Sequence, residues 1–445
     1  MPSNKDILEA QRYNRRRLVT AFMAGTPGGR ELEARPLGRP LIVGAVLALV
    51  LVLVAVLMGR LNPGLRTGWE NDTLVVVKGT GARYFTIDGV LRPVANVTSA
   101  RLLADPSKFE PSEVEASTLA GIPRGTAVGI LEAPDLTPGR DQLRSGQWTA
   151  CATSSGKAHT WVGAVPGGLA SADTAMVTAQ GQDYVVTAGR RYPLDPQGAA
   201  VALGLDGQPL AVDASWLALF EAGSRLQPLQ IPRTGQVAAG MPSGLATAVI
   251  GGLIEIDNDP EHRHFVVTGD GEIAPLTDVA YRLHRLGSGV DAGNPLTVQL
   301  TAITGLKIVD AEPVVPGDWP DQLGSQLTGD RLPCAALVEA DGSARSALAS
   351  IPVPAEGTAS AARAGVTVAG GSGALVRATA GGTLGAVSLV AEPGLAYGIG
   401  DEVADTLTRL KYTEADVHTL PAAWLALVPA GVVLSKDAAW QTVKA

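Results

Sequence analysis

The residues best suited to hold a metal ion lie in one short segment, Asp257 to His264 (DNDPEHRH). Its alternating carboxylates resemble a calcium loop, which requires Gly at its sixth position and Glu at its twelfth. This chain has His262 and Thr268 at those positions, so the calcium interpretation fails. His262 and His264 could bind a transition metal, but the sequence defines no two further ligands. A solvated turn before a strand at Phe265 is the simpler interpretation.

Catalytic motifs with a fixed spacing are not found in the sequence. The nearest approach to a phosphate-binding loop, residues 151–158 (CATSSGKA), has Cys in place of the first Gly and Ala in place of the final Ser or Thr. Neither G-x-S-x-G nor H-E-x-x-H occurs, and His159, His284 and His418 form no cluster. Carboxylates distant in the sequence could still pair for acid–base chemistry. The sequence therefore predicts no catalytic residue, cofactor or metal ion, and a non-enzymatic protein.

An uninterrupted apolar run, residues 41–58 (LIVGAVLALVLVLVAVLM), lies between Arg39 and Arg60. The 20 residues between these two arginines would form a helix of about 30 Å, the thickness of a bilayer core. A cleaved signal peptide has a shorter apolar stretch, about 7–15 residues, and a small-residue cleavage site, which is missing here. We therefore expect a retained membrane span.

The distribution of charge predicts the orientation of this span. Residues 1–39 carry a net charge of +4, whereas residues 61–445 carry −13. Because positive charge near a span stays cytoplasmic, residues 1–39 should be cytoplasmic, residues 40–60 should span the inner (cytoplasmic) membrane, and residues 61–445 should be extracytoplasmic. The acidic net charge argues against a nucleic-acid partner.

The only two cysteines, Cys151 and Cys334, both fall in the predicted extracytoplasmic part. An even pair outside the cytoplasm is most simply a disulfide. Two unrelated buried thiols are the alternative. A bond would bring the segments around the two cysteines together in space.

Three signals recur in the extracytoplasmic part, which is too long for one ordinary core. The first is a strand followed by Gly, three residues later by an aromatic or apolar residue, and then by Asp; it begins at Val75, Val185, Val266 and Leu389. The second is a short helix, VAYRLHRL at 279–286 and VADTLTRL at 403–410. The third is VDASWLALFEAG at 212–223 and PAAWLALVPAG at 421–431. Its tryptophans, Trp216 and Trp424, should pack in each repeat's own core rather than bind a ligand.

These signals predict a β-rich α+β fold with four small repeated α+β lobes near residues 70–135, 181–235, 262–300 and 386–435. The intervening residues 136–180, 236–261 and 301–385 should form a central β lobe, held together by the disulfide. Frequent Gly and Pro and few aromatic residues favour short strands and turns.

Residues 4–24 should form a helix. This helix either is a solvated positive anchor or docks its apolar residues on a cytoplasmic partner or on the membrane surface.

Several of these segments together resemble the EccB family of membrane components of the type VII (ESX) secretion machine. The resemblance rests on the basic helix ILEAQRYNRRRLVTAFM, the single span, residues 96–102 (NVTSARL) and residues 129–135 (GILEAPD), and it covers the whole chain. The more usual family motif, GIPGAPD, is altered here at two positions. The resemblance implies a structural subunit beside a secretion ATPase, other membrane subunits and a mycosin protease, with self-associating extracytoplasmic domains.

The sequence and the resemblance leave three functions open. The first is a structural and assembly subunit of the secretion complex, which contacts neighbouring subunits around the export channel. The second is a membrane-anchored module that binds cell wall through its repeats, gaining avidity from multivalency. The third is an extracytoplasmic metal-dependent hydrolase, supported only by residues 257–264. The resemblance and the missing catalytic motifs favour the first.

Overall fold

The computed structural model describes residues 3–24, 38–61, 64–195, 198–287, 292–312, 314–340, 342–353, 365–400 and 402–443. The chain divides into two compact units, Met1–Arg66 and Thr67–Ala445, and each is described by itself. The fold is β-rich and mixed α+β, with several small sheets, as predicted.

The first unit contains two helices, α1 (Asn4–Ala24) and α2 (Gly38–Leu61). Pro40 is tolerated in α2 because the first turn of a helix does not use its backbone N–H groups. The side chains of α2 are described from residue 42 to residue 55, and they are exposed. A search of the described residues finds no helix that combines the length and the apolar character needed to span a membrane. The membrane span stays a prediction.

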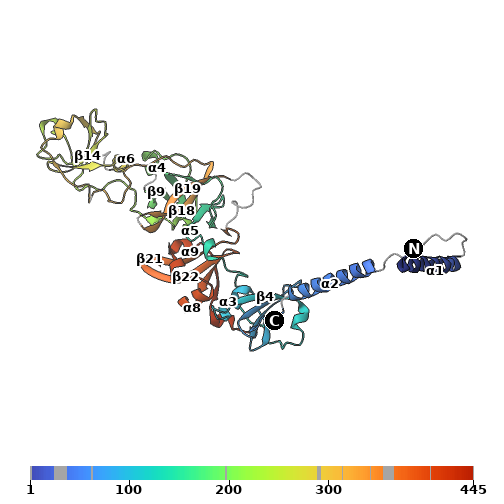
Figure 1. Cartoon of the computed structure of the whole chain (residues 1–445). Helices are drawn as coiled ribbons and strands as arrows, with labels where there is room; N and C mark the ends of the chain where they lie inside the picture. The colour runs from blue at the N-terminus through green and yellow to red at the C-terminus, as the bar shows by residue number, and fades with distance from the viewer. Residues whose placement is uncertain are drawn as a thin grey trace. The chain divides into compact units, whose positions relative to one another are not determined.

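The second unit is organised around a six-stranded sheet with the order β20-β6-β5-β18-β19-β7. Two strands of this sheet, β18 and β19, are labelled in Figure 1. Its longest strands, β18 and β19, form a hairpin, and β5 is buried along its whole length. The bounds are β5 (Trp148–Ala152), β6 (Ala158–Val162), β7 (Ala170–Ser171), β18 (Arg331–Ala340), β19 (Ser343–Pro352) and β20 (Gly365–Val368). We call this the central sheet.

Four further sheets have a common order, in which a three-stranded antiparallel meander gains a parallel strand beside its first strand. In the second, third and fourth sheets another parallel strand pairs with the third strand of the meander. The first lobe contains β1 (Thr73–Val77), β2 (Arg83–Ile87), β3 (Val90–Pro93) and β4 (Glu110–Val114); the second contains β8 (Thr174–Ala179), β9 (Gln182–Thr187), β10 (Arg190–Pro193), β11 (Leu210–Ala211) and β12 (Glu221–Ala222). The third contains β13 (Leu253–Ile256), β14 (His264–Gly269), β15 (Glu272–Leu276), β16 (Leu296–Val298) and β17 (Lys307–Ile308); the fourth contains β21 (Gly373–Ala380), β22 (Thr383–Ala391), β23 (Leu395–Ile399), β24 (His418–Pro421) and β25 (Ala430–Leu434).

Each lobe also has two short helices, one after the meander and one before its last segment. In chain order they are α3 (Val97–Leu103) and η1 (Ala116–Leu119), α4 (Ala199–Ala202) and α5 (Ala214–Leu217), α6 (Asp278–Leu286) and η4 (Leu300–Ile303), and α8 (Val403–Arg409) and α9 (Ala422–Leu425). The remaining described helices are η2 (Arg140–Gln142), η3 (Ser243–Leu245), η5 (Glu414–Asp416) and α10 (Lys436–Ala439).

The strand–Gly alignment used above is wrong for the first lobe. Val75 lies in β1, the first strand of its meander, whereas Val185 lies in β9, the second strand of its meander. The counterpart of the turn at Gly189 is therefore the turn at Gly89, not the turn at Gly81. Both Gly89 (φ 71°) and Gly189 (φ 76°) have the left-handed conformation that glycine adopts without strain. The error arises because both hairpins of a meander give the same strand–Gly pattern.

The predicted central lobe is also too large. β8 belongs to the second sheet, β13 and β17 belong to the third, and β21 belongs to the fourth. Residues 236–252 cover the third sheet, where Leu245 and Ile250 are fully buried in a core shared with β14. These segments carry no repeated motif, so the sequence offered no signal to assign them to a neighbouring sheet.

The tryptophans of the third motif anchor two lobes on the central sheet. Trp216 of α5 is fully buried and its Nε1–H donates to the Ala150 carbonyl of β5 at 2.9 Å. Trp424 of α9 is equally buried; its Nε1–H donates to Ser346 Oγ of β19 at 3.1 Å, and its ring meets Trp148 edge-on. The expectation that the two tryptophans pack within their own repeats is thus incomplete, because the core that contains them also includes residues of the central sheet.

The first and third lobes lack this anchor. The third residue of the second helix is Thr118 in the first lobe and Ala302 in the third, where the other two lobes have Trp. The first lobe shares a buried core with the fourth, and the third shares one with the second. The lobes are therefore joined in two pairs, and one lobe of each pair rests on the central sheet.

Replacing Trp424 by Ala should lower the free energy of unfolding by about 3–5 kcal/mol, because it opens a cavity between the fourth lobe and the central sheet. Thermal unfolding of the full chain in detergent measures the effect. Trp440→Ala is the matched control, since that ring is 42% exposed and its removal should change the free energy of unfolding by less than about 0.5 kcal/mol. Equal losses in both variants would contradict the anchoring role.

Candidate functional site

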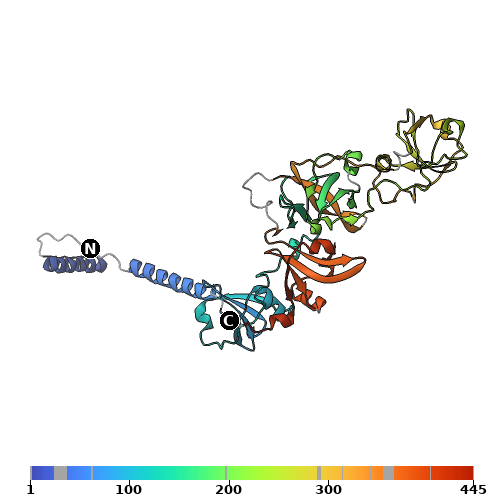
Figure 2. The ribbon, with the colours of Figure 1, turned by 180° about the vertical axis from the view of Figure 1, so that it is seen from behind.

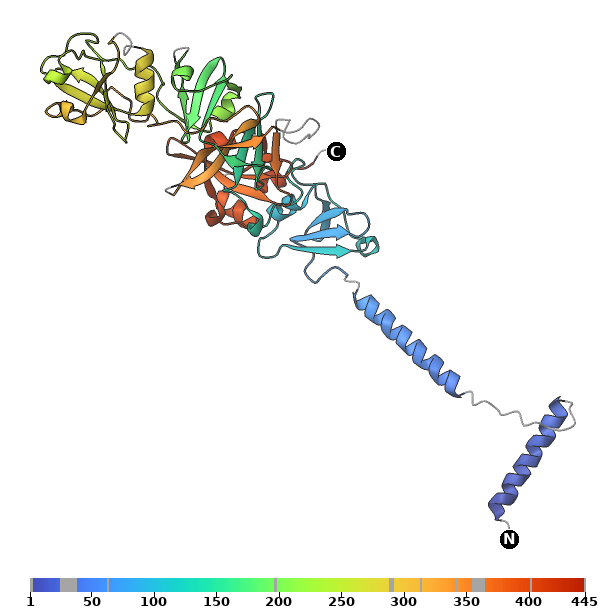
Figure 3. The same ribbon diagram turned by 90° about the horizontal axis from the view of Figure 1, so that it is seen from above.

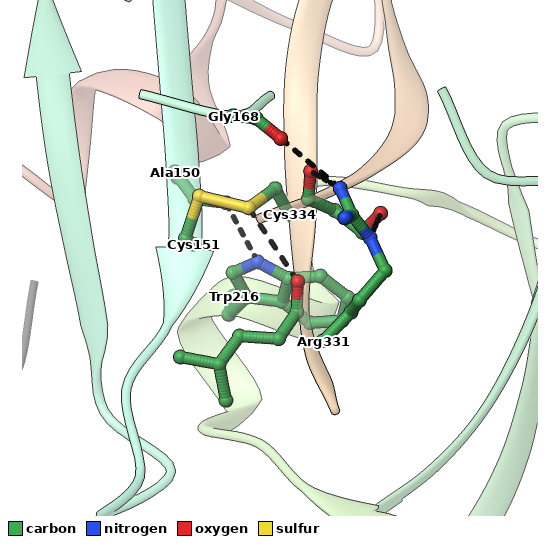
Figure 4. Close-up of a disulfide and its surroundings, with 8 residues drawn as sticks. Ala150, Cys151, Gly168, Trp216, Arg331 and Cys334 are labelled. Carbon is green, nitrogen blue, oxygen red and sulfur yellow. Dashed lines mark hydrogen bonds between the residues drawn. A yellow bond between two sulfur atoms is a disulfide. The ribbon is translucent and has the colours of Figure 1, made fainter. Parts of the chain in front are cut away.

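The two cysteines form a disulfide between adjacent antiparallel strands (Figure 4). Cys151 of β5 lies directly opposite Cys334 of β18, and both are buried. They are separated by 183 residues in sequence, so the bond closes a loop that contains the second and third lobes. On the chain-entropy model a loop of this size stabilises the fold by roughly 4–5 kcal/mol.

Arg331 extends this connection to the edge of the central sheet. Its guanidinium donates to Ser350 Oγ at 2.8 Å, to the Ser350 carbonyl at 2.9 Å and to the Gly168 carbonyl at 3.0 Å (Figure 4). One side chain at the start of β18 therefore binds β19 and the turn before β7. Hydrogen bonds from a charged donor are stronger than neutral ones.

A helix-capping arginine joins the first and fourth lobes, where α3 and α8 lie side by side (Figures 1 and 2). Arg409 of α8 donates to the carbonyls of Leu102 at 3.2 Å and Ala104 at 2.5 Å, at the C-terminus of α3. Asp405, one turn earlier in α8, holds the guanidinium at 2.6 Å. A cation at a helix C-terminus satisfies free carbonyls and interacts favourably with the helix dipole.

The second and third lobes are joined in the same way, with α6 beside α4 (Figure 3). Arg282 of α6 donates to the carbonyl of Leu203, the C-cap of α4, at 3.3 Å, and Asp278 one turn earlier holds it at 2.9 Å. Arg282 and Arg409 are not at the same position of the shared helix motif. The sequence shows only Asp and Arg four residues apart, which is also the pattern of an ordinary surface ion pair.

The segment Asp257 to His264 uses its carboxylates internally. Asp259 accepts two hydrogen bonds from the Arg263 guanidinium, at 2.8 and 3.1 Å, and these bonds hold the pKa of its carboxyl well below the usual range. Asp257 accepts a hydrogen bond from Gln299 at 2.8 Å. Within the described ranges, no three His, Cys, Asp or Glu side chains lie close enough together to hold a metal ion.

The histidines of this segment are not arranged as ligands. His264 stacks on Tyr281 of α6 with ring centroids 3.9 Å apart, and burial lowers the pKa of its imidazole. His262 is exposed. The other histidines lie in different parts of the fold: His159 in β6, His284 in α6 and His418 in β24.

The residues that resemble a phosphate-binding loop form a β-hairpin. Cys151 is the second-last residue of β5 and forms the disulfide. The turn before β6 is closed by hydrogen bonds from Thr153 N–H to the Lys157 carbonyl and from Gly156 N–H to the Thr153 carbonyl. A phosphate-binding loop leads into a helix whose N-terminus faces the phosphates. A strand follows here, so this turn has no such helix.

A groove of about 900 Å³ lies between β19, the second lobe and the fourth lobe. Its charged lining residues carry both signs: Asp173, Arg190, Glu221 and Arg345. Arg190 contacts Glu221 at 3.1 Å, and small side chains such as Ala188 and Ala423 line much of the remainder. The ring of Phe220 is fully buried beneath it. None of the described residues that line the groove is His, Cys or Lys.

The family model described as type VII secretion system ESX-1, transport TM domain B, matches residues 1–444. The chain belongs to the EccB family. This confirms the resemblance seen in the sequence. The chain is 28% identical over 308 residues to the ESX-1 secretion system ATPase EccB1 of Mycobacterium tuberculosis H37Rv, covering 64% of this chain and 60% of that relative.

Other EccB relatives are similar over different lengths. The ESX-3 secretion system ATPase EccB3 of Mycolicibacterium smegmatis is 28% identical, covering 55% of this chain and 50% of that relative. The ESX-3 secretion system ATPase EccB3 of Mycobacterium tuberculosis CDC 1551 is 25% identical, covering 90% of this chain and 82% of that relative. The chain thus spans 60% and 50% of the lengths of EccB1 and the Mycolicibacterium EccB3.

Solved structures share the fold. A chain of an intact ESX-5 inner membrane complex superposes with a TM-score of 0.67 at 21% identity, covering all of this EccB chain and 96% of the other. A chain of the EccB3 dimer from the ESX-3 core complex gives 0.64 at 22% identity, covering 83% and 99%.

Replacing both Cys151 and Cys334 by Ala should lower the free energy of unfolding of this EccB chain by roughly 4 kcal/mol, because the unfolded chain regains the entropy of the open loop. Denaturant unfolding of the full chain, followed by tryptophan fluorescence, measures the change. Reductant added to the double variant is the control and should have no further effect. A double variant as stable as the oxidised parent would contradict the role of the disulfide.

Proposed function

We propose that this chain is a structural and assembly subunit of a type VII secretion membrane complex, whose extracytoplasmic region contacts neighbouring subunits around the export channel. The observation that carries the proposal is the family match over residues 1–444. The joints described above support it, because they link lobes through buried aromatic rings and capped helices rather than gather reactive groups.

The proposed location is the inner membrane, with one span at residues 40–60. The N-terminus would lie in the cytoplasm, and residues 61–445 would be extracytoplasmic. The charge asymmetry of +4 and −13 supports this orientation. The disulfide agrees with it, since such bonds persist in oxidising compartments. We further propose that the four lobes are repeats of one unit, on the basis of their common strand order.

The proposed partners are the other membrane subunits of the secretion complex, including its ATPase, a mycosin protease, and further copies of the extracytoplasmic domain. Two solved relatives, a chain of an intact ESX-5 inner membrane complex and a chain of an EccB3 dimer, support assembly and self-association. On the cytoplasmic side, α1 exposes a group of apolar side chains, among them Leu18, Phe22 and Met23. These lie on one end of the helix and fit a docking contact with another subunit.

Deleting residues 1–25 should release the chain from the larger membrane complex, because this removes the exposed apolar end of α1. The double substitution Leu18→Ser and Phe22→Ser should have the same effect while keeping every charge. Copurification after mild detergent extraction, followed by native electrophoresis, measures it. Lys5→Ser and Thr20→Ser together form the control. If the complex runs unchanged with both the deletion and the apolar double variant, cytoplasmic docking is wrong.

We also propose that the chain itself does not hydrolyse nucleotide, although its relatives are named ATPases. The support is the departure of residues 151–158 from the phosphate-binding motif and their place in a β-hairpin. Purified full chain should release phosphate from ATP no faster than the Lys157→Ala variant. Release that Lys157→Ala abolishes would contradict the proposal.

A further inference from the structure

A histidine lies within the core of the third lobe, next to the joint that holds this lobe to the second. His284 of α6 is fully buried, and its Nε2 lies 2.7 Å from the carbonyl of Gly251. This contact requires the proton on Nε2, because a carbonyl can only accept. Nδ1 is also buried and has no hydrogen-bond partner among the described residues. The ring is therefore held neutral, with its unprotonated nitrogen in an apolar core.

The charged groups on the surrounding elements have other partners. On the sheet below α6, Glu255 of β13 accepts from the Tyr281 hydroxyl, His264 of β14 stacks on the Tyr281 ring, and Glu272 of β15 binds Lys307 at 2.8 Å. The neighbouring helix α4 contains only Ala and Val.

The remaining charged groups near α6 do not offset a charge on the ring either. Asp278 and Arg282 on α6 pair with each other, Arg285 donates to the Tyr281 hydroxyl, and Asp321 contacts α6 through its backbone carbonyl. Among the residues that the structure describes, none of these carboxylates is bonded to the His284 ring, whose hydrogen bond goes to the Gly251 carbonyl. Burial lowers the pKa of this imidazole, and the hydrogen bond to Gly251 opposes the shift to a smaller extent.

We propose that the joint between the second and third lobes is acid-sensitive, because protonation of His284 places an unpaired charge beneath α6. The same helix carries Arg282, which caps α4, so loosening α6 from its sheet also loosens the attachment of the third lobe. The fourth lobe provides an internal comparison. Its equivalent helix, α8, has Thr408 at the position of His284, and Thr408 donates within its own helix to Ala404 at 2.7 Å. The joint between the first and fourth lobes therefore lacks this response.

The direction of the pH effect follows from the lowered pKa. The unfolded imidazole binds its proton near pH 6.5, whereas the folded one stays neutral to lower pH. The stabilisation is therefore complete above about pH 6.5 and is lost as the pH falls below that value toward the lowered pKa. Each unit of difference between the two pKa values changes the ratio of closed to open α6 about tenfold.

Amide hydrogen exchange of the full chain in detergent, corrected for intrinsic rates, tests the proposal at about pH 7.5 and about pH 5. We expect protection of residues 279–286 to fall at the lower pH, about tenfold for each unit by which the folded pKa of His284 lies below its unfolded pKa, while the protection of residues 403–409 changes little. His284→Gln keeps an N–H donor for Gly251 and cannot titrate, so it should reduce the pH response of α6 and leave only the part contributed by His264, which stacks on Tyr281. His262→Gln, an exposed histidine of the same lobe, should keep it.

The proposal is overturned if α6 and α8 lose protection equally, or if His284→Gln responds to pH as the parent does. If His284→Gln fails to fold, the test is the pH dependence of the NMR chemical shifts of the His284 ring nitrogens in the parent protein. A His284 ring that stays neutral below pH 6.5 supports the proposal, and one that titrates at or above pH 6.5 overturns it. Neither measurement depends on the function proposed above.

Discussion

The pairing of β5 with β18 is the contact on which the arrangement of the lobes depends. Two segments far apart in the sequence become neighbouring strands, and a disulfide fixes Cys151 opposite Cys334. The strands then present Trp148 and Ala335 to the core that receives the second and fourth lobes. Bringing such distant segments together costs loop-closure entropy. Once the disulfide has formed, the unfolded chain is already closed at this point, so folding no longer carries that entropy cost.

Two kinds of contact extend outward from this pairing. The tryptophan anchors bury large rings, so they gain mainly from the hydrophobic effect, and each indole N–H finds an acceptor on the central sheet. The joints between paired lobes combine shared apolar cores with an arginine at a helix C-terminus. Such a cation stabilises the fold by up to about 2 kcal/mol when it is partly buried. Arg409 meets this condition better than Arg282, because Arg282 is more exposed. The lobes nearest the central sheet are thus held by the larger of the two contributions.

Much of this organisation could be predicted from the sequence, for identifiable reasons. Two cysteines leave only one intramolecular pairing, and the repeated helix motif at residues 279–286 and 403–410 marks equivalent elements of two lobes. The boundaries of the lobes were harder to predict, because residues 236–252 cover the third sheet without repeating any motif. The roles of Trp216 and Arg409 were missed because periodicity shows that a side chain is buried or paired but not which sheet or helix it meets.

The site was harder to predict than the fold. Residues 257–264 have the composition of a metal site, yet the Arg263 guanidinium donates to the carboxylate of Asp259. This interaction can be recognised only once the geometry of the turn is known. His284 gave no sequence signal either, since one histidine in an amphipathic helix is unremarkable until its burial is known. In both cases the deciding quantity is the local environment of a titratable group, which residue type and spacing leave undetermined.

The disulfide also changes how the chain would carry mechanical load. With Cys151 bonded to Cys334, the shortest covalent path from the first lobe to the fourth crosses directly between β5 and β18. The second and third lobes lie on a side loop of this path. Tension between the two ends of the chain therefore passes through the sulfur atoms, and the backbone of the second and third lobes lies outside the covalent path that bears the load.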